Sequence, residues 1–333
     1  MTNLSNINHL QSSQYKAAVV QAGSITFDFA ATYAKFKKLA TEAAQNCAKL
    51  VVFPEAFLGG YPKGSDFGSY IGGRTEEGRK WYERYYRGSI DVPGPVTDDI
   101  SELAKALNVF LVIGCIERGG STLYCTIIFF DPVKGYLGKH RKLMPTGGER
   151  LVWGFGDGST LPVFDTAIGN LGAVTCWENY MPLLRTKMYE QNIQLYCAPT
   201  MDDRETWVSS MQHIAKEGRC YVFGSCQFLK RKDYPEDYPS HLSQDPEAVY
   251  LKGGSCIINP MGEILAGPNF QAETILYADV DLSSIIRYRF DFDAVGHYSR
   301  PDIFKLTTDT NDRTISADSN QVKVHTAEKK SKL

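Results

Sequence analysis

The sequence predicts an α/β protein in which helices lie outside and mixed β-sheets lie inside. First, short runs rich in β-branched and aromatic residues alternate along the chain with stretches whose apolar residues recur at helical spacing. Second, several of these runs are separated only by tight turns, which indicates antiparallel hairpins among the parallel strands. Third, 43% of the 333 residues are hydrophobic, and no break in composition marks a linker. One layered domain with a substantial core therefore follows.

Local patterns predict each element of the first half of the chain. Residues 16–22, KAAVVQA, form a continuous apolar run that is typical of a buried strand. Residues 28–47 carry apolar side chains at helical spacing, and the next run, KLVVFPE, is a second strand that ends at Glu55. We expect a further helix at 97–107 and further strands at 108–117, 122–131 and 135–143.

The second half continues the alternation of strands and helices. The same criteria predict strands at 161–166, 170–176, 193–199, 220–228, 254–260, 263–268 and 274–281. They predict helices at 182–192, 205–218 and 282–289. Two stretches, 56–94 and 228–252, are rich in Gly, Tyr and charged residues and show little strand pattern. Irregular insertions of this length usually serve as lids, interfaces or disordered loops.

The two ends of the chain differ in composition from the rest. Residues 1–14 are expected to form a flexible arm, residues 15–312 the folded domain, and residues 313–333 a polar, disordered tail. The chain closes with Ser331-Lys332-Leu333, a tripeptide that matches a peroxisomal address. We expect a cytoplasmic protein, or a peroxisomal one if the source is eukaryotic.

Charge and hydropathy exclude several functional classes. The formal net charge is −2, so no basic field indicates a nucleic acid or an anionic membrane as a partner. No apolar run approaches the roughly 18 to 20 residues that a membrane-spanning helix needs. The polar N-terminus lacks the apolar segment of a secretory signal. We therefore expect neither a nucleic-acid partner nor a membrane partner.

Eight cysteines are scattered along the chain, and the surroundings of one of them set it apart. No two have C-x-x-C spacing, so neither a disulfide framework nor a zinc site is expected. Seven are interpreted as small buried apolar residues. Cys176 lies in TCWENYMPLLR, between a run typical of a strand and a run typical of a helix. This position makes Cys176 a candidate nucleophile.

Two charged residues also lie at the ends of predicted strands. Glu55 ends KLVVFPE and Lys142 ends GYLGKHRK. Enzymes of the α/β class often place their sites where strands meet loops, although a single charged residue there is more often solvated surface. A cysteine nucleophile needs a group that generates the thiolate, and the sequence places no histidine near Cys176. The sequence motifs of serine hydrolases, zinc proteases and P-loop proteins are absent.

Several stretches occur in a fixed order and together resemble the nitrilase superfamily of carbon–nitrogen hydrolases. The resemblance depends on four stretches, which are VVFPE, HRKLMP, TGGER and TCWE. The tripeptide CWE resembles the branch of true nitrilases, and VWGFGDGS, APTMDDRETW, GPNF and VGHYSRPD resemble its plant and fungal group. The resemblance covers roughly residues 15–308, which is nearly all of the chain before the tail.

The resemblance implies a role for four residues. Cys176 matches the family's nucleophile and Glu55 its general base. Lys142 matches the catalytic lysine, and Glu149 matches a second glutamate that the family holds beside that lysine. Lys142 and a helix N-terminus just after Cys176 are expected to favour the thiolate.

Tyr61 and Trp177 are expected to bind substrate. Trp177 can equally well pack the strand-to-helix turn, as can Glu178. The backbone N–H of Trp177 is also expected to stabilise developing negative charge.

The resemblance further implies an α-β-β-α sandwich, paired across a homodimer into an α-β-β-α-α-β-β-α stack. Family members often extend into spiral filaments, with the two insertions at the contacts. The implied reaction is hydrolysis of an organic nitrile to a carboxylic acid and ammonia through a cysteine thioimidate and a thioester, with no cofactor and no metal. Amidase, carbamoylase or nitrile hydratase-type activity on the same Glu–Lys–Cys site is the alternative, and a catalytically silent scaffold is another. The sequence leaves the identity of the nitrile open.

Overall fold

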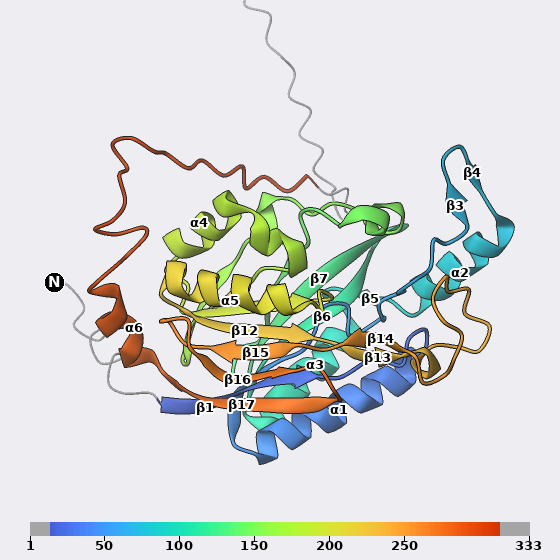
Figure 1. The fold of residues 1–333 in the computed structure, drawn as a ribbon, viewed down its shortest axis with the longest axis horizontal. Helices are drawn as coiled ribbons and strands as arrows, with labels where there is room; N and C mark the ends of the chain where they lie inside the picture. The colour runs from blue at the N-terminus through green and yellow to red at the C-terminus, as the bar shows by residue number, and fades with distance from the viewer. Residues whose placement is uncertain (1–13, 314–333) are drawn as a thin grey trace, which may run out of the picture.

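Two β-sheets pack face to face at the centre of the molecule, and helices cover their outer surfaces (Figure 1). The computed structural model describes residues 14–313. Most of the predicted arm, nearly all of the predicted tail and the terminal Ser331-Lys332-Leu333 therefore lie outside the described residues. Within residues 14–313, no helix is both long enough and apolar enough to cross a membrane.

The two sheets share one pattern of strand pairing. In each, three neighbouring strands run parallel, with one antiparallel strand on one side and two successive antiparallel strands on the other. The first sheet has the order β17-β1-β2-β6-β7-β8, with the short β5 beside β6: β1 (Gln14–Gln21), β2 (Ala48–Val52), β5 (Ile90–Asp91), β6 (Phe110–Gly119), β7 (Thr122–Asp131), β8 (Gly135–Arg141), β17 (Thr274–Asp281). The second has the order β16-β15-β12-β11-β10-β9: β9 (Val163–Thr166), β10 (Gly169–Ala173), β11 (Leu195–Thr200), β12 (Tyr221–Cys226), β15 (Ser255–Ile258), β16 (Ile264–Asn269).

Three apolar layers hold the sandwich together. One cluster between the sheets includes Val52 from the first sheet and Phe223 from the second, both fully buried. A second cluster packs α1 (Phe29–Gln45) and α3 (Pro95–Leu107) on the outer face of the first sheet. A third packs α4 (Pro182–Glu190) and α5 (Glu205–Gly218) on the outer face of the second. The predicted α-β-β-α arrangement is therefore confirmed, with α6 (Leu282–Arg289) following β17.

The local sequence accounts for how α1 forms and which side it buries. Asp28 is the N-cap, and its side chain accepts a hydrogen bond from the Ala31 N–H, which would otherwise lack an intrahelical partner. Phe36, Ala40 and Ala43 recur at spacings of four and three residues, so they share one face and are fully buried against the first sheet.

The segment 56–94 is more regular than the sequence pattern predicts. It contains α2 (Glu76–Arg87) and a small hairpin of β3 (Ser69–Tyr70) and β4 (Gly73–Arg74), which project at one end of the molecule (Figure 1). Charged residues dominate α2 and hide its buried side, which consists mainly of Trp81 and Tyr85. The interpretation of this segment as irregular is therefore wrong.

The segment 228–252 packs against the first insertion. It contains β13 (Phe228–Lys230) and β14 (Val249–Lys252), which pair with each other. The Tyr234 hydroxyl donates to the Tyr61 carbonyl oxygen, with an O–O distance of 2.9 Å. The Tyr238 ring contacts the Trp81 ring edge-on, with centroids 5.6 Å apart. The two insertions thus form one aromatic cluster beside the sandwich.

Two smaller predictions need correction. The predicted strand 220–228 is interrupted at Gln227, because β12 ends at Cys226 and β13 begins at Phe228. Cys47, interpreted as buried, is exposed, whereas the other seven cysteines are buried and all eight are free thiols.

Candidate active site

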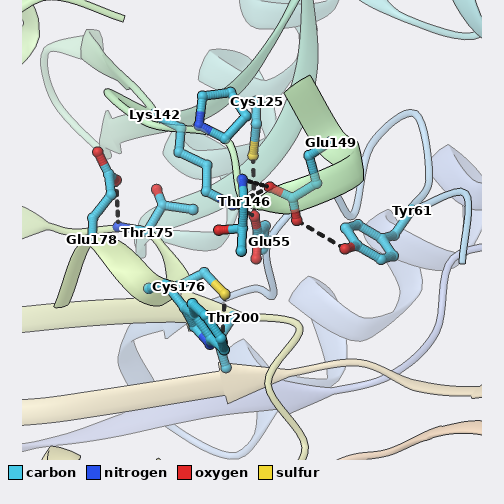
Figure 2. A network of polar contacts seen from close by, with 12 residues as sticks. Glu55, Tyr61, Cys125, Lys142, Thr146, Glu149, Thr175, Cys176, Glu178 and Thr200 are labelled. Carbon is cyan, nitrogen blue, oxygen red and sulfur yellow. Dashed lines mark hydrogen bonds and ion pairs between the residues drawn. The ribbon is translucent and has the colours of Figure 1, made fainter. Parts of the chain in front are cut away.

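Glu55, Lys142 and Cys176 come from different strands but meet at one edge of the sandwich (Figure 2). Glu55 follows β2 and Cys176 follows β10, each at the carboxyl end of a parallel strand. Lys142 follows β8, which is antiparallel to β7, and β7 is antiparallel to β6. The carboxyl end of β8 therefore lies at the same edge of the first sheet as that of β2. All three side chains are buried.

The Glu55 side chain is placed by a close approach of backbone segments. Gly114 of β6 lies against the Glu55 backbone, and a Cβ atom there would sit 2.6 Å from the Glu55 Cα. The Gln227 side chain donates to the Glu55 carbonyl oxygen, with an N–O distance of 2.9 Å. Ala56, the next residue, has a φ of +51°, a backbone conformation that L-residues rarely adopt. Strained backbone of this kind is often found at functional sites.

The two carboxylate oxygens of Glu55 have different surroundings. Oε1 accepts from the Lys142 ammonium at 2.7 Å and from the Cys125 thiol at 3.4 Å. Oε2 is buried and has no hydrogen-bond partner among the described residues. Burial raises the pKa of Glu55, although the Lys142 ammonium opposes this effect. A buried, unpartnered carboxylate oxygen is well suited to accept a proton.

Lys142 is held between two carboxylates. Its Nζ lies 2.7 Å from Glu55 Oε1 and 2.8 Å from Glu149 Oε2. Burial alone would lower the pKa of Lys142, but Glu55 and the other acidic groups around it, Glu149 among them, outweigh burial and raise the pKa well above its ordinary value. Lys142 is therefore a fixed ammonium, able to donate hydrogen bonds.

Cys176 occupies a strained turn between the two elements predicted around it. The strand β10 ends at Ala173, a short 3-10 helix spans Cys176–Tyr180, and Cys176 has a φ of +51°. The Asn179 side-chain amide donates to the Val174 carbonyl at 2.9 Å and to the Cys176 carbonyl at 2.8 Å. This pair of bonds fixes the direction in which the thiol points. The Thr200 hydroxyl donates to the sulfur at 3.2 Å.

Lys142 favours the Cys176 thiolate, as expected, but its effect on the pKa is smaller than that of burial. Burial raises the pKa of Cys176 to about 12, and the Glu55 carboxylate adds to the rise, while the Lys142 ammonium only partly opposes it. The helical turn that begins at Cys176 is the short 3-10 helix, and the longer α4 begins only at Pro182. A raised thiol pKa calls for a neighbouring base that removes the proton before attack.

Glu149 and Tyr61 connect the buried ammonium to a surface hollow. The Tyr61 hydroxyl donates to Glu149 Oε1 at 2.8 Å, and Glu149 Oε2 accepts from both Lys142 and the Thr146 N–H. Tyr61 and Glu149 line a hollow of about 230 Å³, together with Trp153 and others. Tyr61 thus lies at the wall of a hollow that adjoins the buried groups, and substrate binding by Tyr61 stays a prediction.

Trp177 is half-exposed and does not line this hollow. Its indole N–H donates to Asp202 Oδ2 at 2.8 Å, and the Arg204 guanidinium lies 5.2 Å from its ring centroid. These contacts fix the ring beside the Cys176 turn. Both interpretations of Trp177, as a pocket residue and as a packing residue, stay open.

Several residues of the site escaped the sequence analysis. Cys125 was interpreted as a plain buried residue, yet its thiol donates to Glu55. Thr200 and Gln227 lie in or directly after strongly apolar runs, and an isolated polar residue in such a run is the signal that could have found them. Asn179 carried no such signal, because it directly follows the charged Glu178 rather than lying within an apolar run.

The chain is similar to known proteins over nearly its whole described length. The family model described as carbon-nitrogen hydrolase matches residues 16–290. A protein named nitrilase blr3397 from Bradyrhizobium diazoefficiens is 58% identical over 295 residues, which cover 89% of this chain and 92% of that protein. The bifunctional nitrilase/nitrile hydratase NIT4B from Nicotiana tabacum is 54% identical over 295 residues, which cover 87% of this chain and 85% of that protein.

Solved structures agree in fold. The crystal structure of a carbon–nitrogen hydrolase from Helicobacter pylori G27 aligns with a TM-score of 0.70 at 18% identity, covering 89% of this chain and 98% of that one. The crystal structure of Saccharomyces cerevisiae Nit3, a member of branch 10 of the nitrilase superfamily, aligns with a TM-score of 0.67 at 23% identity, covering 88% of this chain and 98% of that one. The match of the family model over most of the chain shows that this protein belongs to the carbon–nitrogen hydrolase family.

Proposed function

We propose that this protein is a nitrilase that hydrolyses an organic nitrile to the carboxylic acid and ammonia. The observation that carries the proposal is the group of one thiol, one ammonium and two carboxylates at Cys176, Lys142, Glu55 and Glu149, of which only Glu149 is partly exposed. The relatives at 54–58% identity add support, since their names include nitrilase and aliphatic nitrilase.

The first half of the reaction forms a covalent bond to sulfur. Glu55 accepts the thiol proton at Oε2, and the Cys176 thiolate attacks the nitrile carbon. The nitrogen gains electron density as its triple bond to carbon becomes a double bond. The Lys142 ammonium donates a hydrogen bond to it, and the Trp177 backbone N–H is a second donor. The nitrogen then takes up the proton that Glu55 accepted from sulfur, which gives a thioimidate and returns Glu55 to its carboxylate form.

The second half consumes two water molecules. Glu55 removes a proton from the first water, which adds to the thioimidate carbon and gives a tetrahedral intermediate. Protonation of the nitrogen lets ammonia leave, and a thioester remains on Cys176. A second water, deprotonated by the same carboxylate, releases the carboxylic acid and returns the proton to sulfur. One base therefore serves three proton transfers, which fits a buried carboxylate with a raised pKa.

Amide release is the second candidate outcome at the same site. The tetrahedral intermediate contains both a carbon–nitrogen and a carbon–sulfur bond, and breaking the carbon–sulfur bond releases an amide instead of ammonia. Three tobacco and lupin relatives at 53–54% identity are named bifunctional nitrilase/nitrile hydratase. We infer that a minor amide product accompanies the acid.

Product analysis tests both statements. The purified protein is incubated with a panel of aliphatic, arylaliphatic and amino-acid-like nitriles, and ammonia, acid and amide are measured in each reaction. We expect acid and ammonia in equal amounts from at least one nitrile, with amide as the minor product. Release of ammonia from the matching amides but from none of the nitriles would show that the protein is an amidase instead.

We also propose that the protein forms a homodimer through the face formed by the Cys176–Tyr180 turn and α4. This face exposes four large apolar side chains close together in the sequence, of which Leu183 is 69% exposed: Trp177, Tyr180, Met181, Leu183. Monomeric proteins rarely expose a contiguous apolar patch of this kind. A second copy would cover it and would bring two second sheets and their helices together, as in the α-β-β-α-α-β-β-α stack. Extension into a spiral filament stays a prediction.

A single charge on this face is expected to disrupt the dimer. Leu183→Glu places a carboxylate where the two copies would pack, so light scattering should give a monomer mass for the variant and a dimer or larger mass for the natural protein. Val133→Glu is the matched control, since Val133 is an exposed apolar residue in the turn between β7 and β8. Equal masses for all three proteins would contradict the proposed interface.

A further inference from the structure

The Glu178 carboxylate binds the backbone on both sides of the candidate active site. Its Oε1 accepts a hydrogen bond from the N–H of Leu143, the residue directly after Lys142, at an N–O distance of 2.6 Å. Its Oε2 accepts a hydrogen bond from the N–H of Thr175, the residue directly before Cys176, at an N–O distance of 3.1 Å, as Figure 2 shows. Its side chain is fully buried. One carboxylate thus joins the residue after the lysine to the residue before the cysteine.

His140 is the third partner of this carboxylate. Its Nε2 lies 3.0 Å from Glu178 Oε2, and its Nδ1 lies 2.7 Å from the Thr160 carbonyl oxygen. A carbonyl oxygen only accepts, so Nδ1 carries a proton, and a carboxylate at Nε2 calls for a second one. Both contacts therefore favour the imidazolium form of the ring. Burial alone would lower the pKa of His140, but the Glu178 carboxylate outweighs burial and raises it.

This bridge spans the two layers of the sandwich. His140 lies on β8 of the first sheet, and Lys142 follows the same strand. Cys176 and Glu178 follow β10 of the second sheet. A shift of one sheet against the other would therefore change the separation between the lysine nitrogen and the cysteine sulfur. Displacement of a reacting group by about 1 Å can lower a rate by about 10²-fold.

We propose that Glu178, paired with protonated His140, is a positioning residue that fixes Cys176 relative to Lys142 across the two sheets. This inference rests on the proposed function, because the reaction requires both side chains at one substrate atom. Glu178 itself is two residues from the nucleophile and has its oxygens occupied by two backbone N–H groups and the imidazolium. It acts on the rate through those partners rather than by touching substrate.

A second buried carboxylate offers a matched control. Glu117 on β6 is 1% exposed and binds the Lys139 ammonium and the Arg141 guanidinium, which belong to the same strand β8. Its hydrogen bonds reach β7 and β8 but not the turn around Cys176. Glu117→Gln therefore neutralises a comparable buried charge without touching the bridge between the sheets.

The test compares Glu178→Gln, Glu117→Gln and the natural protein. For Glu178→Gln we expect kcat for nitrile hydrolysis to fall about 10²-fold while KM changes little. The substitution would displace Cys176 relative to Lys142 but would leave the residues that line the substrate hollow in place. We expect Glu117→Gln to lower the melting temperature but to keep kcat within about threefold, since none of the Glu117 hydrogen bonds reaches the turn around Cys176. His140→Gln keeps both backbone bonds to Glu178 and is expected to lower kcat about 10-fold. His140→Gln therefore replaces Glu178→Gln as the test variant if Glu178→Gln does not fold.

Alkylation of Cys176 by iodoacetamide, followed by mass spectrometry of peptides, gives a readout that needs no nitrile. In Glu178→Gln we expect slower labelling of Cys176 while the other buried cysteines stay protected. A kcat and a Cys176 labelling rate equal to those of the natural protein, with only a lower melting temperature, would overturn the inference and leave Glu178 a stabilising residue. If the natural protein hydrolyses no nitrile, the proposed function fails, and the labelling rates still test the bridge.

Discussion

Replacement of Cys176 by alanine is expected to abolish nitrile turnover and to leave the fold intact. The substitution removes the sulfur that forms both covalent intermediates, and loss of a covalent nucleophile lowers turnover by on the order of 10⁵-fold or more. Alanine keeps the Cβ atom and therefore keeps the backbone strain at the φ of +51° unchanged. The Asn179 bonds to the turn involve backbone carbonyls and survive the substitution. Ammonia release and the thermal unfolding curve measure the two effects.

Cys256→Ala is the matched control for the nucleophile. Cys256 is equally buried, but it lies on β15, in the cluster that packs α5 against the second sheet. We expect this variant to lose about 1–2 kcal/mol of stability through a small cavity and to keep its turnover. A folded Cys176→Ala protein that still released ammonia from nitriles at a rate near that of the natural protein would rule out the covalent mechanism.

Glu55→Gln is expected to lower turnover about 10³- to 10⁴-fold, since an amide has nearly the same shape as the carboxylate but accepts no proton. The amide oxygen can still accept from the Lys142 ammonium, so the fold should tolerate the change. The variant lacks the base that accepts the thiol proton, and burial raises the pKa of Cys176 to about 12, which disfavours ionisation without that base. Steady-state kinetics and the rate of Cys176 alkylation should therefore fall together.

The pH profile of the natural protein gives an independent check on Glu55. The carboxylate must be ionised to accept a proton, and burial raises its pKa. Activity should therefore decline as the pH falls through that raised value, so the acid limb of kcat/KM should lie above the ordinary range of a glutamate. Glu55→Asp keeps a base but shortens its reach, and we expect it to retain more activity than Glu55→Gln. Equal kcat values for Glu55→Gln and the natural protein would exclude Glu55 as the base.

The sequence predicted the elements of the fold well where apolar periodicity was strong. The runs around β2, β6 and β7 are nearly continuous in apolar residues, because these strands are buried on both faces between helices and the second sheet. The α2 helix was missed because all of its residues except Gly78 and Trp81 are charged or tyrosine, so it shows no apolar face in the sequence. Its buried side depends instead on contacts with residues 228–252. Local periodicity carries no information about such a distant partner.

The chemistry of the site was predicted less completely than its residues. Order and motif identified Glu55, Lys142, Glu149 and Cys176, and the structure brings them together. The dominant effect on the Cys176 thiol was not predicted, because its pKa depends on how completely the fold removes water from it. The contacts of Gln227 and Cys125 with Glu55 were missed for a related reason, since they join residues 172 and 70 positions apart.

The sequence by itself determined the family, the layered fold class and the four polar residues of the site, since motifs and apolar periodicity are local properties of the chain. The tertiary structure alone decided which Glu55 oxygen has no partner among the described residues, that burial raises the pKa of Cys176, and that Glu178 bridges the two sheets. Each of these depends on burial and on hydrogen bonds between segments distant in sequence. Those quantities exist only when the two sheets pack against each other.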